Sequence, residues 1–277
     1  MKAGGMRVLF VGDIVGRPGR RAVAWWIPRL RRERAIDLII ANGENAAAGS
    51  GITEKIGESL FATGVDVITT GNHAWDKRDG IPLIEEGRIL RPANYPPGVG
   101  GIGALVAHTP GGEPVGVLNV QGRAFMRDID CPFRVAKREI ERLRSEAVAI
   151  VVDFHAEATA EKIAMGWYLD GEVSAVIGTH THVQTADERV LPGGTAYITD
   201  VGMTGPHESV IGMEVRGSIH RMLTGLPTRL EPAKNDIRLC GVIIDIDATS
   251  GHAQRLERIN LPLEDAQKPL SDQEEPE

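Results

Sequence analysis

The chain has 277 residues, of which 42% are hydrophobic and 25% are charged. This balance is ordinary for a globular protein with one large core or two modest ones. The net charge of −7 argues against a general nucleic-acid coat but does not exclude a nucleotide-sized substrate. The two cysteines, Cys131 and Cys240, are far apart in the sequence, which argues against a disulfide framework and favours reduced thiols.

The sequence predicts a cytoplasmic protein. The segment ahead of the first apolar run, residues 1–5, is too short to be a signal peptide. No stretch approaches the roughly 18 apolar residues that a membrane span requires. Only 4% of the residues are aromatic, so the core is expected to be aliphatic.

Apolar runs of strand length alternate with amphipathic helical patterns along the chain. Strands are expected at residues 7–12, 37–41, 65–70, 115–120, 147–154, 173–177, 195–199 and 239–245, and helices at 19–34, 53–62, 132–144, 159–169 and 217–223. The alternation predicts an α/β architecture whose sheet is at least partly parallel. The closely spaced later strands, with Pro-Gly-Gly at 192–194 between two of them, indicate an antiparallel or mixed portion. A two-sheet sandwich flanked by helices would accommodate both.

Residues 1–261 are expected to form one domain. Within it, the stretch 91–112 is rich in proline and glycine and is predicted to be a long surface loop. Residues 262–277 are polar and acidic, so we predict a disordered tail there.

Polar side chains that can bind metals follow five of the apolar runs, at points where the strands should end. In chain order they are Asp13, Glu44 with Asn45, Asn72 with His73, His155, and His180 with His182. In open α/β sheets, ligands collect at the carboxyl ends of strands, so we expect one shared crevice. The glycines at positions 12, 43, 71 and 178 are expected to permit the sharp turns that aim these side chains.

Each of these groups also has an ordinary structural interpretation. Asp13 could cap the helix that begins near Pro18, and His155 could be a hydrogen-bonded histidine at a strand end. The Glu44-Asn45 and Asn72-His73 pairs could belong to polar turns. Their common position at strand ends favours a site instead.

The remaining histidines do not share this position. Three of them are expected at the surface: His108, His220 and His252. His207 follows another strand end and is a candidate substrate-binding residue at the rim of the site.

The donor set indicates more than one metal ion. Without His73, seven donor residues remain, which are too many for a tetrahedral zinc site. Mixed carboxylate, amide and imidazole donors suit Mn²⁺ and Fe²⁺. A carboxylate that bridges two such ions would hold them about 3.5–4 Å apart, the spacing used for in-line displacement at phosphorus. His73 would then remain free to protonate the leaving oxygen.

The order of these motifs resembles the calcineurin-like metallophosphoesterases. It most resembles their YmdB-like branch, which comprises bacterial phosphodiesterases acting on cyclic nucleotides. The resemblance rests on FVGDIVGRPG at 10–19, ANGENA at 41–46, TGNHAWD at 70–76 and GTHTH at 178–182, and it covers about residues 6–260. It implies the calcineurin-like metallophosphoesterase fold, an α/β two-layer mixed β-sandwich flanked by helices.

The resemblance also implies a dinuclear site and a role for each residue. Glu44 would bridge the two ions, and His73 falls where the family carries its catalytic histidine. One metal would be held by Asp13 and His182, with Asn45 as a further partner; the other would be held by Asn72, His155 and His180.

Two motifs depart from the wider superfamily. Asp13 is followed by Ile14 and Val15, so the histidine of the usual Asp-x-His motif is missing, and Glu44 replaces an aspartate at the bridge. Both departures are expected in the YmdB-like branch. A site with fewer nitrogen donors shifts the preference toward harder ions, so Mg²⁺ is compatible alongside Fe and Mn, as is Zn²⁺.

The expected function is metal-dependent hydrolysis of 2′,3′- or 3′,5′-cyclic nucleotides, by attack of a metal-bridging hydroxide on phosphorus. Two alternatives stay open: a phosphomonoesterase or nucleotidase with the same metals, and a non-catalytic metal-containing regulator that binds RNA or a protein. The expected partner is a small nucleotide, without a membrane. RNA as substrate or regulatory target and a homo-oligomer are also compatible with the sequence.

Overall fold

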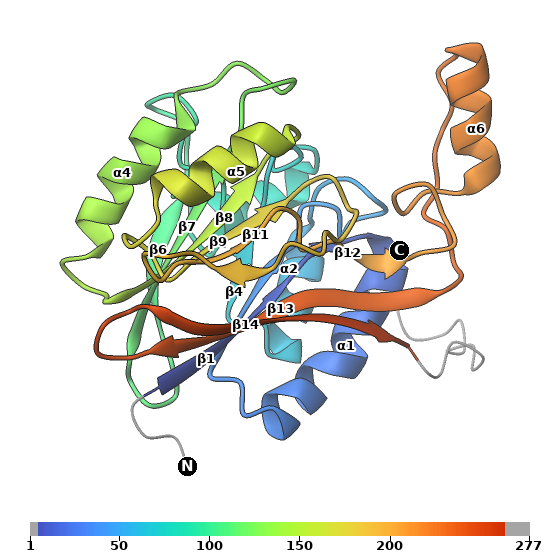
Figure 1. Cartoon of the computed structure of the whole chain (residues 1–277). Helices are drawn as coiled ribbons and strands as arrows, with labels where there is room; N and C mark the ends of the chain where they lie inside the picture. Colours follow the sequence, from blue (N-terminus) through green and yellow to red (C-terminus); the bar gives the residue numbers. More distant parts are fainter. Residues whose placement is uncertain (1–4, 264–277) are drawn as a thin grey trace.

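Two β-sheets pack face to face, and helices cover their outer faces (Figure 1). The computed structural model describes residues 5–263. One sheet has eight strands in the order β2-β12-β13-β1-β3-β4-β5, with β14 also paired to β13, and the other has six in the order β10-β11-β9-β8-β7-β6. The predicted α/β two-layer mixed sandwich with flanking helices is therefore confirmed.

The strands of the first sheet are β1 (Gly5–Val11), β2 (Asp13–Ile14), β3 (Leu38–Asn42), β4 (Val67–Thr69), β5 (Ile89–Leu90), β12 (Met203–Pro206), β13 (Ile237–Asp247) and β14 (Ala253–Pro262). Those of the second are β6 (Ala104–His108), β7 (Pro114–Gln121), β8 (Ala149–His155), β9 (Ala175–Thr179), β10 (Arg189–Val190) and β11 (Ala196–Ile198). Each sheet has a parallel centre, β1-β3-β4-β5 and β7-β8-β9-β11. Because strands of one direction end at one edge, the loops that follow them gather there.

The helices are α1 (Gly16–Glu33), α2 (Glu54–Thr63), a short 3₁₀ turn η1 (Arg78–Gly80), α3 (Ile81–Glu85), α4 (Pro132–Leu143), α5 (Thr159–Tyr168) and α6 (Val215–Thr224). The first three α-helices pack on the outer face of the first sheet, and α4 and α5 pack on the outer face of the second. Helix α6 projects away from the body of the sandwich (Figure 1). Within residues 5–263, every helix is too short or too polar to cross a lipid bilayer.

The space between the sheets is apolar along most of the strands and polar at their carboxyl ends. Side chains alternate between the two faces of a strand, so every second residue points inward. On β8 the inward residues change from Ala149 and Val151 to Asp153 and His155, all of them buried. The same change occurs at Asn42 on β3 and at Thr69, Asn119, Gln121 and Thr179 on β4, β7 and β9. A buried polar layer is costly unless it is paired, so it marks the candidate site.

Some predicted boundaries were wrong. The stretch 91–112 is not only a loop, because it contains β6, an edge strand that pairs antiparallel with β7. The predicted tail begins too early, since Pro262 still belongs to β14 and the backbone N–H of Leu263 donates to Ile237 O over 2.8 Å. The rest of that predicted tail, 264–277, lies outside the described residues.

Candidate dinuclear metal site

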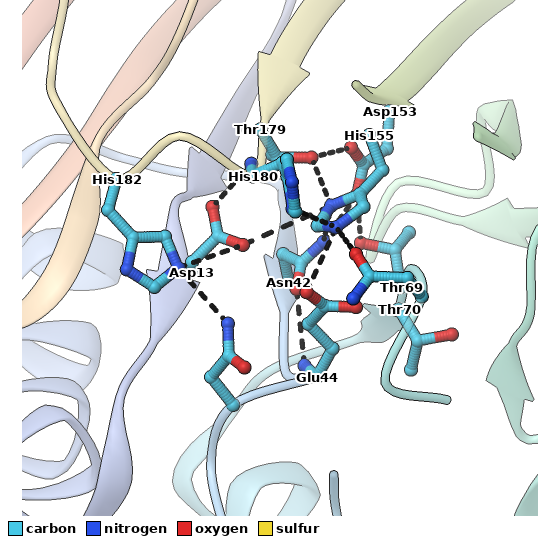
Figure 2. A network of polar contacts seen from close by, with 12 residues as sticks. Asp13, Asn42, Glu44, Thr69, Thr70, Asp153, His155, Thr179, His180 and His182 are labelled. Carbon is cyan, nitrogen blue, oxygen red and sulfur yellow. Dashed lines mark hydrogen bonds and ion pairs between the residues drawn. The ribbon is translucent and has the colours of Figure 1, made fainter. Parts of the chain in front are cut away.

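All the metal-binding candidates lie at the carboxyl edge of the sandwich, on loops and strand ends from both sheets. Figure 2 shows five of them close together: Asp13, Glu44, His155, His180 and His182. Asp13 and the Glu44-Asn45 pair come from the first sheet, after β1 and β3. The Asn72-His73 pair follows β4 of that sheet. The second sheet contributes His155 at the end of β8 and the 180–182 segment after β9.

Three potential ligand atoms surround Nε2 of His155. Glu44 Oε1 lies 2.9 Å away, His180 Nδ1 3.0 Å and Asn72 Oδ1 3.1 Å. A proton on Nε2 can form a hydrogen bond with only one of these three atoms. Ligand atoms of Glu44, His155 and His180 all lie within 4.8 Å of one another. Lone pairs that converge in this way are typical of a cation site.

Asp13, Asn45 and His182 form a second group beside the first. His182 Nε2 lies 3.8 Å from Asp13 Oδ1 and 3.1 Å from the amide nitrogen of Asn45. Nδ1 of His182 lies 2.9 Å from the carbonyl oxygen of Ile211, to which it can donate. Such a bond holds the ring with Nε2 toward Asp13. Asn45 would offer its oxygen to an ion only if its amide group were rotated by about 180°.

Two buried carboxylate oxygens have no aligned hydrogen-bond donor within the described part of the chain. They are Asp13 Oδ1 and Glu44 Oε1, one in each group, on side chains that are fully buried. An unsatisfied buried polar atom costs about 1–3 kcal/mol, and a charged one costs more. A cation between the two groups would compensate both oxygens, so the residues present fit a metal site.

The charges of the site lead to the same conclusion. Burial disfavours a charged imidazole, but the carboxylates of Glu44, Asp13 and Asp153 outweigh it and raise the pKa of His155 to about 9. Burial likewise disfavours the ionised form of Glu44, yet His155 beside it lowers the pKa of Glu44 to about 2. Negative charge is therefore in excess, and a proton on His155 offsets part of it. A divalent cation would displace that proton.

A hydrogen-bond relay behind His155 fixes its orientation. The Thr179 hydroxyl donates to Asp153 Oδ1 over 2.7 Å and lies 2.9 Å from His155 Nδ1. Since its hydrogen is used by Asp153, the hydroxyl accepts from Nδ1–H, and Nε2 is left facing Glu44. Asn42 Nδ2 donates to the other oxygen of Asp153 over 3.1 Å. Such partners orient metal-binding histidines and raise their basicity.

The supporting residues of this relay were not singled out from the sequence. Asp153 occurs inside an apolar run, whereas Asn42 and Thr179 are the last residues of β3 and β9. The signal that identifies them is their position on the inward face, because each follows inward apolar residues at a spacing of two near the carboxyl end of its strand.

The role of the glycines differs from the sequence prediction. Positions 12, 43, 71 and 178 do not adopt the left-handed φ that sharp glycine turns use. They allow close approach instead. A Cβ on Gly71 would lie 2.1 Å from His155 Cδ2 and 2.5 Å from Glu44 Oε2, and one on Gly178 would lie 1.8 Å from Thr199 O.

The left-handed residues are the two histidines of the 180–182 segment. The φ angle is 96° at His180 and 67° at His182. A non-glycine residue rarely holds such an angle, and it persists only where the surroundings enforce it. Backbone strain at two candidate ligands one residue apart is typical of a functional site.

A buried ion pair holds the segment in this shape. Lys162 Nζ of α5 lies 2.7 Å from Asp200 Oδ2, and both side chains are buried. The same oxygen accepts from the backbone N–H of Thr181 at 3.0 Å and from its hydroxyl at 2.6 Å. Thr181 is thereby fixed between the two histidines. The sequence suggested no role for Lys162, because helical lysines are normally exposed.

His73 lies beside Glu44 but is more exposed than the candidate ligands. Its backbone N–H donates to Glu44 Oε2 over 3.1 Å. Its Nδ1 lies 2.7 Å from Asp76 Oδ2, which leaves Nε2 as the ring nitrogen that can exchange a proton with a substrate. The sequence did not indicate Asp76, which continues the motif three residues after the histidine.

His207 is placed apart from these groups. Its Nε2 lies 3.4 Å from Cys240 Sγ of β13, and its backbone N–H donates to Asp236 O. No described contact joins it to the ligand groups. The other three histidines outside the site are exposed, as predicted: His108, His220 and His252.

Replacing Gly71 by alanine tests whether the space beside His155 and Glu44 matters. The added methyl group would overlap both side chains, so we expect bound metal and turnover to fall by at least about tenfold. Gly217→Ala in α6 is the control, because its Cβ would meet nothing closer than 3.5 Å. Elemental analysis, turnover and melting temperature are measured together. If Gly71→Ala kept full metal content and rate, the described packing around His155 would be wrong.

The chain is similar to known proteins over nearly its whole length. The family model described as "YmdB-like protein" matches residues 9–259. A "2′,3′-cyclic-nucleotide 2′-phosphodiesterase" of Bacillus subtilis (strain 168) is 49% identical over 255 residues, which cover 92% of this chain and 96% of that protein.

Two solved structures share the fold. A hypothetical protein from Thermus thermophilus superposes with a TM-score of 0.86 at 43% identity, covering 93% of this chain and 99% of the other. A protein from Mycoplasma pneumoniae described as a novel phosphatase has a TM-score of 0.87 at 34% identity, covering 93% and 94%. Both cover nearly all of the sandwich and its loops.

Proposed function

The chain belongs to the family of YmdB-like proteins, and from this we propose that it is a metal-dependent phosphodiesterase acting on 2′,3′-cyclic nucleotides. The Bacillus subtilis relative, 49% identical, bears the name of that activity. Similarity extends over 92% of the chain, and the family model spans residues 9–259, which include every candidate ligand, so the same class of reaction is supported.

The observation that carries the proposal is the convergence of ligand atoms at the carboxyl edge of the sandwich. Glu44 would lie between two metal positions. Asn72, His155 and His180 would hold one ion, and Asp13, His182 and Asn45 the other. When bound, a pair of divalent ions would neutralise phosphoryl charge and lower the pKa of the attacking water. The mixed donor set favours Fe²⁺ or Mn²⁺ over Mg²⁺ and Zn²⁺.

The chain's own residues supply the remaining chemistry. Water adds to phosphorus, the bond from phosphorus to the ribose 2′ oxygen breaks, and that oxygen needs a proton. We assign this proton to Nε2 of His73, and the 2.7 Å contact between its Nδ1 and Asp76 Oδ2 supports the assignment. The products are then a nucleoside 3′-phosphate and a neutral 2′ hydroxyl.

Metal removal tests the proposal. Protein freed of metal with a chelator should lose at least about 99% of its activity on a 2′,3′-cyclic nucleotide. Fe²⁺ or Mn²⁺ should restore it better than Mg²⁺ or Zn²⁺, with about two ions bound per chain. Full activity in protein shown by elemental analysis to be free of metal would rule out the metal-dependent mechanism.

Assays on several substrates distinguish a phosphodiesterase from a phosphomonoesterase. The second activity is a candidate because the Mycoplasma pneumoniae structure is described as a phosphatase. Rates on a 2′,3′-cyclic nucleotide, a 3′,5′-cyclic nucleotide and a nucleoside 3′-monophosphate are compared under the same metal. The proposal predicts that the 2′,3′-cyclic substrate is hydrolysed fastest. A faster rate on the monophosphate would assign the chain to the phosphomonoesterases.

A further inference from the structure

Phe125 is the most exposed large apolar side chain in the described part of the protein. The residue is 91% exposed, in a chain with only five phenylalanines. The other phenylalanines are buried or partly buried against the cores. Packing in the monomer therefore gives no reason for an aromatic residue at position 125.

Backbone geometry gives no reason for it either. Phe125 is the third residue of a turn from Arg123 to Met126, closed by a hydrogen bond of 3.1 Å from the Met126 N–H to the Arg123 carbonyl. Its φ angle is 62°, a value that turns normally give to glycine or asparagine. Both the exposure and the angle disfavour phenylalanine, so a functional contact is the remaining reason for it.

The turn is anchored to the candidate site. The backbone N–H of Gly122 donates to the carbonyl of His155 over 2.9 Å. The next two N–H groups, of Arg123 and Ala124, donate to the Glu161 carboxylate over 3.0–3.2 Å. Three residues span at most about 11 Å, so the Phe125 backbone lies within one nucleotide length of the strand end that carries His155.

The flanking residues suit a nucleotide. Arg123 and Arg127 are exposed on either side of Phe125, with Asp128 following, although the whole chain has a net charge of −7. Burial raises the pKa of Tyr95 and Arg127 partly offsets this, which indicates that the guanidinium lies near that ring. Tyr95 packs edge-to-face on Trp75 with ring centroids 6.1 Å apart. Trp75 lies two residues after His73, so Arg127 and Tyr95 connect this turn to the loop that carries His73.

We propose that Phe125 is a stacking platform for the base of the nucleotide substrate. The inference rests on the proposed function and extends it, because it assigns the base-binding side of the site. Stacking on an aromatic face accepts every base. The site is therefore expected to bind the four nucleotides with similar affinity, and purines somewhat more tightly than pyrimidines because their rings are larger.

The glycine variant separates a binding role from a structural one. Phe125→Gly should raise the KM for a nucleoside 2′,3′-cyclic phosphate about tenfold and leave kcat within about twofold. Because glycine suits a φ of 62°, its melting temperature should equal or exceed that of the wild type. Phe125→Trp, which keeps an aromatic face, should retain the wild-type KM.

A substrate without a base is the matched control. The KM for methyl riboside 2′,3′-cyclic phosphate should be the same in the wild type and in Phe125→Gly. An unchanged nucleotide KM in the glycine variant, or an equal rise for the base-free substrate, would overturn the inference. Failure of the proposed function would look different, since the wild type itself would then not cleave cyclic nucleotides. In that case the affinity for a nucleoside 3′-monophosphate is measured by calorimetry in the wild type and in Phe125→Gly. Equal affinities would show that Phe125 does not bind the base.

Discussion

Replacement of Glu44 by glutamine is expected to abolish turnover and to empty at least one metal position. The substitution keeps the shape of the side chain but removes a charge that is fully buried and lies 2.9 Å from His155 Nε2. A neutral amide cannot balance two divalent ions, and it offers only one oxygen where the other carboxylate oxygen accepts from the His73 N–H. The loss of several kcal/mol of charge stabilisation corresponds to a rate below about a thousandth of the wild type.

Elemental analysis and initial rates are measured on the same preparation. Glu58→Gln is the control, since Glu58 is a surface glutamate paired with Arg88. It should keep both the rate and the metal content of the wild type. A Glu44→Gln variant with two bound metals and a near-wild-type rate would refute the dinuclear site built on Glu44.

Replacement of His73 by alanine should lower kcat about 10²- to 10⁴-fold while the metal content stays that of the wild type. The reason is geometric: His73 reaches the ligand groups through its backbone N–H, whereas its ring is held by Asp76 and is partly exposed. Removing the ring takes away the proton donor and leaves the candidate ligands in place.

Metal analysis of the same variant decides between the two roles of this ring. Loss of metal from His73→Ala would make the imidazole a ligand and leave the reaction without its proposed acid. His108→Ala is the control, because His108 is an exposed histidine at the end of a strand. It should keep the kcat and the metal content of the wild type. Asp76→Asn should give a smaller loss in kcat than His73→Ala, because it disturbs only the orientation of the ring.

The strand-end ligands could be predicted from the sequence because of one topological rule. Parallel strands end at one edge, so the polar residue after each apolar run must lie near the others. Asn72, His155 and His180 come from strands of both sheets and still meet within hydrogen-bond distance. The sequence order alone carried that information.

The residues that hydrogen-bond to the candidate ligands could not be predicted from the sequence in the same way. Asp153 lies inside an apolar run, and its partners Asn42 and Thr179 come from other strands. These residues meet only because of the register between neighbouring strands and the packing of the two sheets. Neither can be derived from a single sequence. Lys162 was missed for a related reason, because its burial depends on the distant Asp200.

Two of the strands that were not predicted, β6 and β14, share a physical cause. β6 and β14 lie at sheet margins, where one face is partly exposed and the residue pattern is mixed. β14 in particular alternates charged and apolar residues, and it becomes a strand through its pairing with β13. Such strands depend on a long-range partner more than on their own composition.

The most direct test of the dinuclear site is anomalous diffraction from crystals of the protein grown with Mn²⁺. Two peaks about 3.5–4 Å apart are expected on either side of the Glu44 carboxylate. One should be bounded by Asn72, His155 and His180, and the other by Asp13 and His182. No peak at this edge of the sandwich, or a single peak that Glu44 does not contact, would contradict the account.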